Sequence, residues 1–166
     1  MPIVYLLIGL QGSGKSYWAN ENASRLEAEV ISSDEIRNEL EAKGEKEIGN
    51  ERVFAIFNQR LEKLLKAGRN VILDATHARR AWRADSLKIA RQHGATVVGA
   101  WFDVPLAICR QRNASRIGQL WGERAVPDAF LLGVAREFEG PTAGEFDKVW
   151  RVGETGQRIA SQNRFA

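Results

Sequence analysis

The 166 residues match the length of one ordinary globular domain, long enough to bury a core without disulfides or structural metals, so we expect a single domain over residues 1–166. The 24 basic and 21 acidic side chains give a net charge of +3, too small an excess to identify an anionic partner. Cys109 is the only cysteine, which excludes an internal disulfide and favours a reducing cytoplasm. Because no apolar run nears membrane-spanning length, we expect neither a secreted nor a membrane-embedded protein.

The first predicted elements are a strand, a glycine-rich loop and a helix. Residues 3–8 form a continuous apolar run, which is typical of a strand buried on both faces of a parallel sheet. Residues 9–16 read GLQGSGKS and match the phosphate-binding pattern G-x-x-x-x-G-K-[ST] at every fixed position. Residues 15–26 read as a helix, whose N-terminus adds partial positive charge at the loop. A glycine-rich turn that binds nothing is the alternative, and this strand–loop–helix order argues against it.

We therefore interpret residues 9–16, the phosphate loop, as a nucleoside triphosphate site. Backbone N–H groups of Gly12, Ser13 and Gly14 would point at a phosphate, in a concavity that side chains would block. Lys15 would contact the β- and γ-phosphates, and the Ser16 hydroxyl would complete the coordination of a magnesium ion.

Strands and helices alternate along the rest of the chain. A short strand over 29–32 precedes a helix that Ser33 or Asp34 would cap, and Ser32 with Glu35 resembles a capping box. Apolar residues recur at helical spacing from Glu51 until Gly68. The later predicted elements are strands over 70–73, 96–102 and 148–152, helices over 79–93, from 105 and over 127–139, a flap over 117–126 and a polar tail over 153–166.

This alternation predicts an α/β fold in which a parallel five-stranded sheet is sandwiched between helices. Ligands of such sheets bind at the carboxyl ends of the strands, so the phosphate loop, Asp34 and Asp74 should meet at one edge.

Asp34 is the candidate general base, because a kinase that acts on a hydroxyl needs a carboxylate to accept its proton. A helix cap is the alternative role. Arg37, one turn further on, could bind an anionic group of the acceptor, or it could be a surface arginine paired with a glutamate. Asp74 could orient magnesium through water, or it could be a structural turn residue.

Arginine is dense over 79–83 and 110–124, which suggests either phosphate contact or a solvated helix face. Arg112 and Arg116 would share a helix face and could reach the γ-phosphate as a lid closes. Trp121 could stack on a base or pack against the body of the protein. His77 and His93 have no clustered ligands in the sequence, and no zinc-type spacing exists.

Together these motifs resemble the P-loop polynucleotide 5′-hydroxyl kinases. The resemblance runs from residue 3 to about residue 152 and rests on segments in the family's order: GLQGSGKS (9–16), DEIR (34–37), VILDAT (71–76), FDVP (102–105), RNASR (112–116) and AVP (125–127). It implies a P-loop kinase fold with a lid over about 112–126. The segment between Arg116 and Val126 is longer than the family pattern. The 166 residues contain no phosphatase or ligase motif of the kind often fused to such kinases, so we expect any end-healing or ligase partner to be a separate protein.

The resemblance also implies functions for single residues. Lys15 and Ser16 would bind ATP and Mg²⁺, and Asp34 would activate the 5′-hydroxyl of a nucleic-acid end. Arg37 would hold the substrate phosphate beside that hydroxyl, and Arg116 would stabilise the transferring phosphate. Beyond the resemblance, we place Asp74 at the metal, Arg112 at the nucleotide and Thr76 at the substrate. Related kinases with a similar D-x-x-R phosphorylate small alcohols, antibiotics or nucleotide sugars, which is the main alternative. A nucleotide-dependent switch without transfer chemistry is a third interpretation, and the Asp34–Arg37 pair argues against it.

Overall fold

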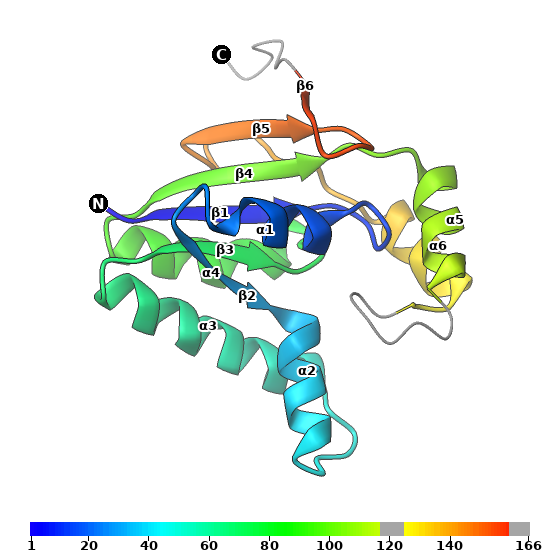
Figure 1. Ribbon diagram of the computed structural model, residues 1–166, viewed down its shortest axis with the longest axis horizontal. Coiled ribbons are helices and arrows are strands. Elements are labelled where there is room, and N and C mark those ends of the chain that lie inside the picture. The colour runs from blue at the N-terminus through cyan, green and yellow to red at the C-terminus, as the bar shows by residue number, and fades with distance from the viewer. Residues whose placement is uncertain (117–124, 160–166) are drawn as a thin grey trace.

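A computed structural model describes residues 1–116 and 125–159. Its strands form one sheet in the order β2-β3-β1-β4-β5-β6 (Figure 1). Parallel pairing joins the first five, and β6 pairs antiparallel with β5. The predicted five-stranded parallel sheet is therefore confirmed, with one short antiparallel strand added at its edge. The strands are β1 (Ile3–Ile8), β2 (Ala28–Ser32), β3 (Asn70–Asp74), β4 (Thr96–Phe102), β5 (Lys148–Val152) and β6 (Arg158–Ile159).

Helices cover both faces of this sheet. Alternate residues of β1 enter two separate cores: Leu6 packs with the apolar faces of α3 and α4, whereas Leu7 packs with Trp18 of α1 and Cys109 of α5. This two-sided burial explains why the sequence of β1 is apolar throughout. Figure 1 shows α1 in front of the sheet. The helices are α1 (Lys15–Ala23), α2 (Ser33–Ala42), α3 (Asn50–Lys66), α4 (Arg80–Gln92), α5 (Leu106–Ser115) and α6 (Asp128–Arg136).

Several predicted boundaries differ from the structure by a few residues, the following two among them. Helix α1 ends at Ala23 instead of Leu26, and the chain turns through Glu27 with a φ of 49° before β2 begins. The predicted polar tail contains β6, so part of it belongs to the sheet. Most of the predicted flap, including Trp121, lies outside the described residues. No helix within 1–116 and 125–159 is both long and apolar enough to cross a membrane.

Arg83 anchors α4 to the segment that precedes β5. Its side chain is fully buried, and its Nε and Nη2 atoms donate to the two Glu145 carboxylate oxygens over 2.8 and 2.9 Å. The same guanidinium donates to the carbonyls of His77, Glu139 and Gly140. Burial alone would raise the pKa of Glu145, but hydrogen bonds from Arg83 and Thr142 outweigh it and lower that pKa to about 2. The interpretation of Arg83 as a phosphate contact is therefore wrong, because the protein itself satisfies its donors.

Arg83→Met should lower the free energy of unfolding by about 3 to 5 kcal/mol, because it leaves the Glu145 carboxylate buried without its partner. Urea titration measures this loss. Arg80→Ala is the matched control, since Arg80 is exposed and its Nε lies 3.8 Å from the same carboxylate. That variant should change stability by about 0.5 kcal/mol or less. Equal effects of the two variants would contradict the anchoring role of Arg83.

Candidate functional site

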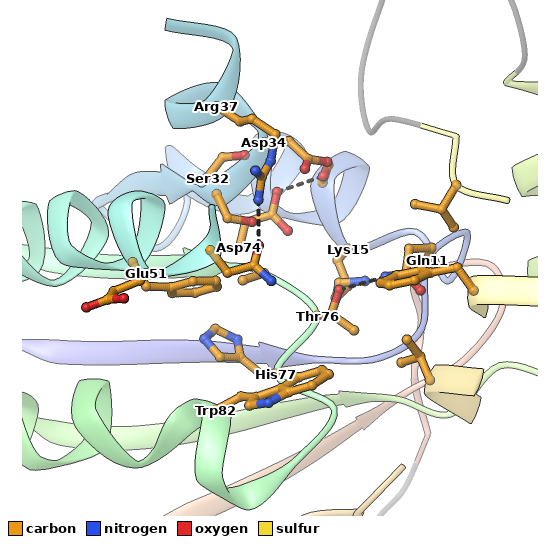
Figure 2. A pocket seen from close by; sticks show the side chains of 18 of the residues that line it. Gln11, Lys15, Ser32, Asp34, Arg37, Glu51, Asp74, Thr76, His77 and Trp82 are labelled. Atoms are coloured by element: carbon orange, nitrogen blue, oxygen red, sulfur yellow. Dashed lines mark hydrogen bonds between the residues drawn. The ribbon is translucent and has the colours of Figure 1, made fainter. Parts of the chain in front are cut away.

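A cavity of about 580 Å³ opens at the carboxyl ends of β1, β2 and β3 (Figure 2). Side chains from the phosphate loop, the start of α2, the start of α3, the end of β3, α4 and α6 form its wall. The parallel sheet brings these segments together although they are far apart in the sequence. The lining residues include six of the predicted site residues, namely Lys15, Ser16, Asp34, Arg37, Asp74 and Thr76.

The phosphate loop has the backbone conformation that its glycines predict. Gly12 and Gly14 have φ values of 83° and 94°, in the left-handed region that side chains disfavour. A Cβ atom at position 12 would also lie 2.4 Å from the carbonyl oxygen of Cys109 in α5, so a side chain cannot fit there. The buried Lys15 donates from Nζ to the Leu10 carbonyl over 2.8 Å, which holds its ammonium group against the loop.

Ser16 and Asp74 meet across the sheet edge. The Ser16 hydroxyl donates to the Asp74 carboxylate over 2.7 Å, and Asp74 is buried at the end of β3. A hydroxyl and a carboxylate are the oxygen ligands that Mg²⁺ accepts in proteins, directly or through water. The pair therefore fits the donor set that a magnesium ion beside the phosphate loop would need.

The hydrogen bonds at the start of α2 show which of its two possible roles Asp34 can have, helix cap or cavity residue. Ser32 is the N-cap residue, and its Oγ accepts a hydrogen bond from the Glu35 backbone N–H over 3.3 Å. Asp34 therefore does not cap this helix, and its half-buried side chain faces the cavity (Figure 2). This observation removes the alternative role that the sequence left open.

Arg37 lines the same cavity and also holds the loop that leads into α3. Its guanidinium donates to the Ile48 carbonyl over 2.9 Å and to the Asn50 Oδ1 atom over 2.7 Å. The expected alternative, a pair with a glutamate, does not occur in the hydrogen bonds and ion pairs of the described residues. Two hydrogen bonds thus hold the Arg37 guanidinium at the cavity wall.

Arg112 of α5 and Arg116 at its C-terminal end are not among the residues that line this cavity. Arg112 donates to the Gly12 carbonyl over 3.3 Å and to the Glu154 carbonyl over 2.6 Å, which places it against the outer side of the phosphate loop. Arg116 is the C-cap residue of α5 and is not among the residues that form the cavity wall. The structure therefore brings Arg112 to the phosphate loop, whereas Arg116 is outside the described cavity wall.

His77 belongs to the site although the sequence analysis gave it no role. The residue follows β3 with a φ of 48°, and its buried ring lines the cavity. Its Nδ1 lies 2.8 Å from the Leu7 carbonyl and must donate to it, so Nε2 is the unprotonated nitrogen of the neutral ring. Burial lowers the pKa of His77 to about 4, and the charges of Lys15 and Arg83 act in the same direction. Its position three residues after a strand-end aspartate was the available signal.

Thr76, predicted at the acceptor site, is held by the phosphate loop. Its Oγ1 accepts a hydrogen bond from the Gln11 Nε2 over 3.2 Å, and its carbonyl accepts one from the Gly9 N–H over 3.1 Å. Gln11 also lines the cavity, and the sequence analysis did not identify it. These bonds fix the end of β3 relative to the loop.

The low pKa of His77 predicts a pH dependence of stability. Between about pH 6.5 and pH 4 the imidazole is protonated in the unfolded chain but neutral in the folded protein. The free energy of unfolding therefore falls as the pH decreases through this interval, and the contribution of His77 is fully present above it. Urea titrations at several pH values measure the slope. His77→Gln should have a flatter dependence between pH 6.5 and 4, and an unchanged slope would contradict the assignment.

The sequence model of the AAA domain matches residues 4–141. The chain belongs to the AAA domain family. The match spans the phosphate loop, Asp34, Asp74, Arg112 and Arg116, so the whole candidate site lies within this AAA domain. None of the curated proteins matches the sequence significantly.

Solved structures with the same fold include several kinases. A gluconokinase from Sinorhizobium meliloti 1021 is similar with a TM-score of 0.62 and 17% identity, over 94% of this chain and 85% of that one. A chain of the Pnkp1/Rnl/Hen1 RNA repair complex has a TM-score of 0.69 and 24% identity, over 82% of this chain and 43% of that one. Kti12 of Chaetomium thermophilum, in complex with ADP-AlF3, has a TM-score of 0.67 and 16% identity, over 90% of this chain and 88% of that one. This AAA domain therefore has a P-loop kinase fold.

Proposed function

We propose that this AAA domain is an ATP-dependent kinase that transfers the γ-phosphate to the 5′-hydroxyl of a nucleic-acid end. The observation that carries the phosphotransfer proposal is the shared cavity. Lys15, the hydrogen-bonded Ser16–Asp74 pair and Asp34 all face it from different strand ends. A triphosphate on the phosphate loop and a hydroxyl beside Asp34 would thus meet in one space.

Each of these side chains has a definite task in such a reaction. Lys15 binds the β- and γ-phosphate oxygens, and Arg112 contacts the nucleotide from the outer side of the loop. Ser16, with Asp74 acting through water, would hold a magnesium ion, which supplies positive charge to the phosphates. Asp34 accepts the proton of the attacking hydroxyl. The hydroxyl oxygen bonds to the γ-phosphorus, and the bond between the γ-phosphorus and the ADP oxygen breaks. Arg116 is proposed at the transferring phosphate from the family resemblance and from its place one helical turn after Arg112, directly before the predicted flap.

The nucleic-acid acceptor is supported by the order of the motifs and by Arg37. The hydroxyl at a nucleic-acid 5′-end has a phosphate a few bonds away on the same nucleotide, and the planar guanidinium at the cavity wall can bind it. Separate end-healing or ligase proteins would then act on the product. One observation favours the second candidate, a small-molecule hydroxyl: the wall carries four carboxylates, from Asp34, Glu51, Asp74 and Asp85, against the cations Lys15 and Arg37.

Labelled ATP and Mg²⁺ should be incubated with the protein, 5′-hydroxyl DNA and RNA oligonucleotides, and a panel of small alcohols, sugars and nucleosides. Label on the oligonucleotide end is the expected result. Label on a small alcohol alone would replace the nucleic-acid acceptor with the second candidate. ATP hydrolysis without label on any acceptor would contradict the proposed kinase activity.

Arg37 provides a test of the acceptor. A nucleoside 3′-monophosphate should be a good substrate and the bare nucleoside a poorer one, because only the former offers the phosphate contact. Arg37→Ala should remove most of that difference in kcat/KM. Asn50→Ala serves as the control, because it removes one hydrogen-bond partner of Arg37 but keeps the guanidinium. If nucleoside and nucleotide react equally in the wild-type protein, Arg37 does not bind a substrate phosphate.

A further inference from the structure

Aromatic side chains line the part of the cavity formed by α3, α4 and α6. Trp82 of α4 and Phe130 of α6 are 44% and 53% exposed, and both contribute to its wall. Phe54 of α3 lines the same cavity and is half-buried. Large aromatic residues are usually buried, so two exposed ones that share a cavity indicate a surface that a ligand covers.

The Trp82 ring is held in place from within the protein. The guanidinium of Arg79 lies 5.7 Å from the Trp82 ring centroid, and Arg79 is in turn paired with Glu137 over 3.4 Å. Figure 2 shows the indole beneath His77, along the lower side of the cavity. A ring fixed in this way offers its aromatic surface to a planar ligand at little cost in conformational entropy.

Asp85 lies about one turn after Trp82 on α4, on the same face of the helix, and also lines the cavity. No hydrogen bond or ion pair joins it to another of the described residues. An ionised carboxylate only accepts hydrogen bonds, so this part of the cavity is suited to a ligand that presents N–H groups. A carboxylate there would repel a phosphate, which directs the phosphate of an acceptor toward Arg37 instead.

We propose that Trp82 and Phe130 form a stacking site for the nucleobase of the acceptor nucleotide, with Asp85 accepting a hydrogen bond from its exocyclic amine. The proposal rests on the proposed function and identifies which part of the acceptor enters the cavity beside the hydroxyl. A flat base matches the aromatic surfaces, and adenine, cytosine and guanine carry the amine that thymine and uracil lack. The acidic wall then contacts base N–H groups, and the backbone phosphate lies on the side of Arg37.

The test compares 5′-hydroxyl oligonucleotides that end in adenosine with otherwise identical ones that end in an abasic nucleotide. Trp82→Leu should raise KM for the adenosine end between about fivefold and 150-fold with little change in kcat. The same variant should not change KM for the abasic acceptor. Trp82→Phe keeps a stacking ring and should restore most of the affinity. Equal KM values for the two acceptors in the wild-type protein would overturn the stacking site.

Asp85 is tested by base preference. The wild-type protein should prefer adenosine to thymidine at the 5′-end, and Asp85→Leu should reduce that preference because the acceptor oxygen is lost. Glu62→Leu, on the exposed face of α3 and outside the cavity, is the matched charge control. An unchanged preference in Asp85→Leu would overturn the amine contact.

A binding measurement separates this proposal from the proposed function. Adenosine should quench tryptophan fluorescence of the wild-type protein without ATP, and the quenching should fall in Trp82→Phe, which lacks that indole. If no nucleic-acid end is phosphorylated but Trp82-dependent quenching persists, the kinase acceptor is wrong and the base site stands. If oligonucleotides are phosphorylated without such quenching, the base site is overturned and the proposed function stands.

Discussion

Lys15→Ala is expected to reduce phosphoryl transfer by a factor of about 100 or more. The ammonium group lies on the phosphate loop, where charge develops on the β- and γ-phosphate oxygens during transfer, and alanine provides no substitute for it. The measurement is the single-turnover rate with labelled ATP and a saturating acceptor, which isolates the chemical step from product release.

Lys15 is buried, so stability must be measured on the same variant. The lost hydrogen bond from the charged Lys15 ammonium to the Leu10 carbonyl should cost about 1.5 to 3 kcal/mol, which leaves a folded protein. Lys88→Ala, an exposed lysine on α4 outside this cavity, controls for the loss of one positive charge. Wild-type rates in a folded Lys15→Ala protein would contradict the triphosphate assignment.

Asp34→Asn should slow transfer by about 100- to 10,000-fold while ATP binding and thermal stability stay close to wild type. Asparagine keeps the size and polarity of the side chain but cannot take the proton of the attacking hydroxyl. The fold should tolerate the change because Ser32, and not Asp34, caps α2. Turnover, nucleotide affinity and melting temperature on one preparation measure the three quantities.

Glu35→Gln is the matched comparison, because Glu35 is the neighbouring carboxylate in the first turn of α2, is exposed and does not line the cavity. It should transfer phosphate at nearly the wild-type rate. Near-native turnover in Asp34→Asn, with or without a loss of stability, would remove the general base from the proposed mechanism.

The part of the site that could be predicted from the sequence depends on local rules. The phosphate loop follows from a pattern in which every fixed position has a backbone or charge requirement, and Asp74 follows from its place at the end of an apolar strand. Asp34 was identified with two possible roles. The spacing of Ser32 and Glu35 already resembled a capping box, and the structure confirms that the Ser32 hydroxyl accepts the Glu35 N–H at the helix start.

The residues that the sequence analysis missed depend on long-range packing. Arg83 looks like its exposed neighbour Arg80 in the sequence, and only the approach of Glu145 makes it a buried anchor. Trp82 is of a residue type that is usually buried, yet its position on α4 leaves it exposed in the cavity wall. Likewise, nothing near His77 in the sequence reveals the Leu7 carbonyl that selects its tautomer. Periodicity predicts which face of a helix is apolar but not which distant segment covers it.

The central position of β1 has a consequence for how the chain folds. Val4 pairs with Val71 on one side and with Val97 on the other, so both neighbours of the first strand are synthesised long after it. Such non-local pairing must overcome the entropy of closing large loops before it contributes stability, which slows folding. A nascent chain that has emerged only as far as α3 holds all eight residues of the phosphate loop but no strand beside β1. The nucleotide site is therefore encoded first and assembled late, and we expect ATP to bind the growing chain only after β4 has joined the sheet.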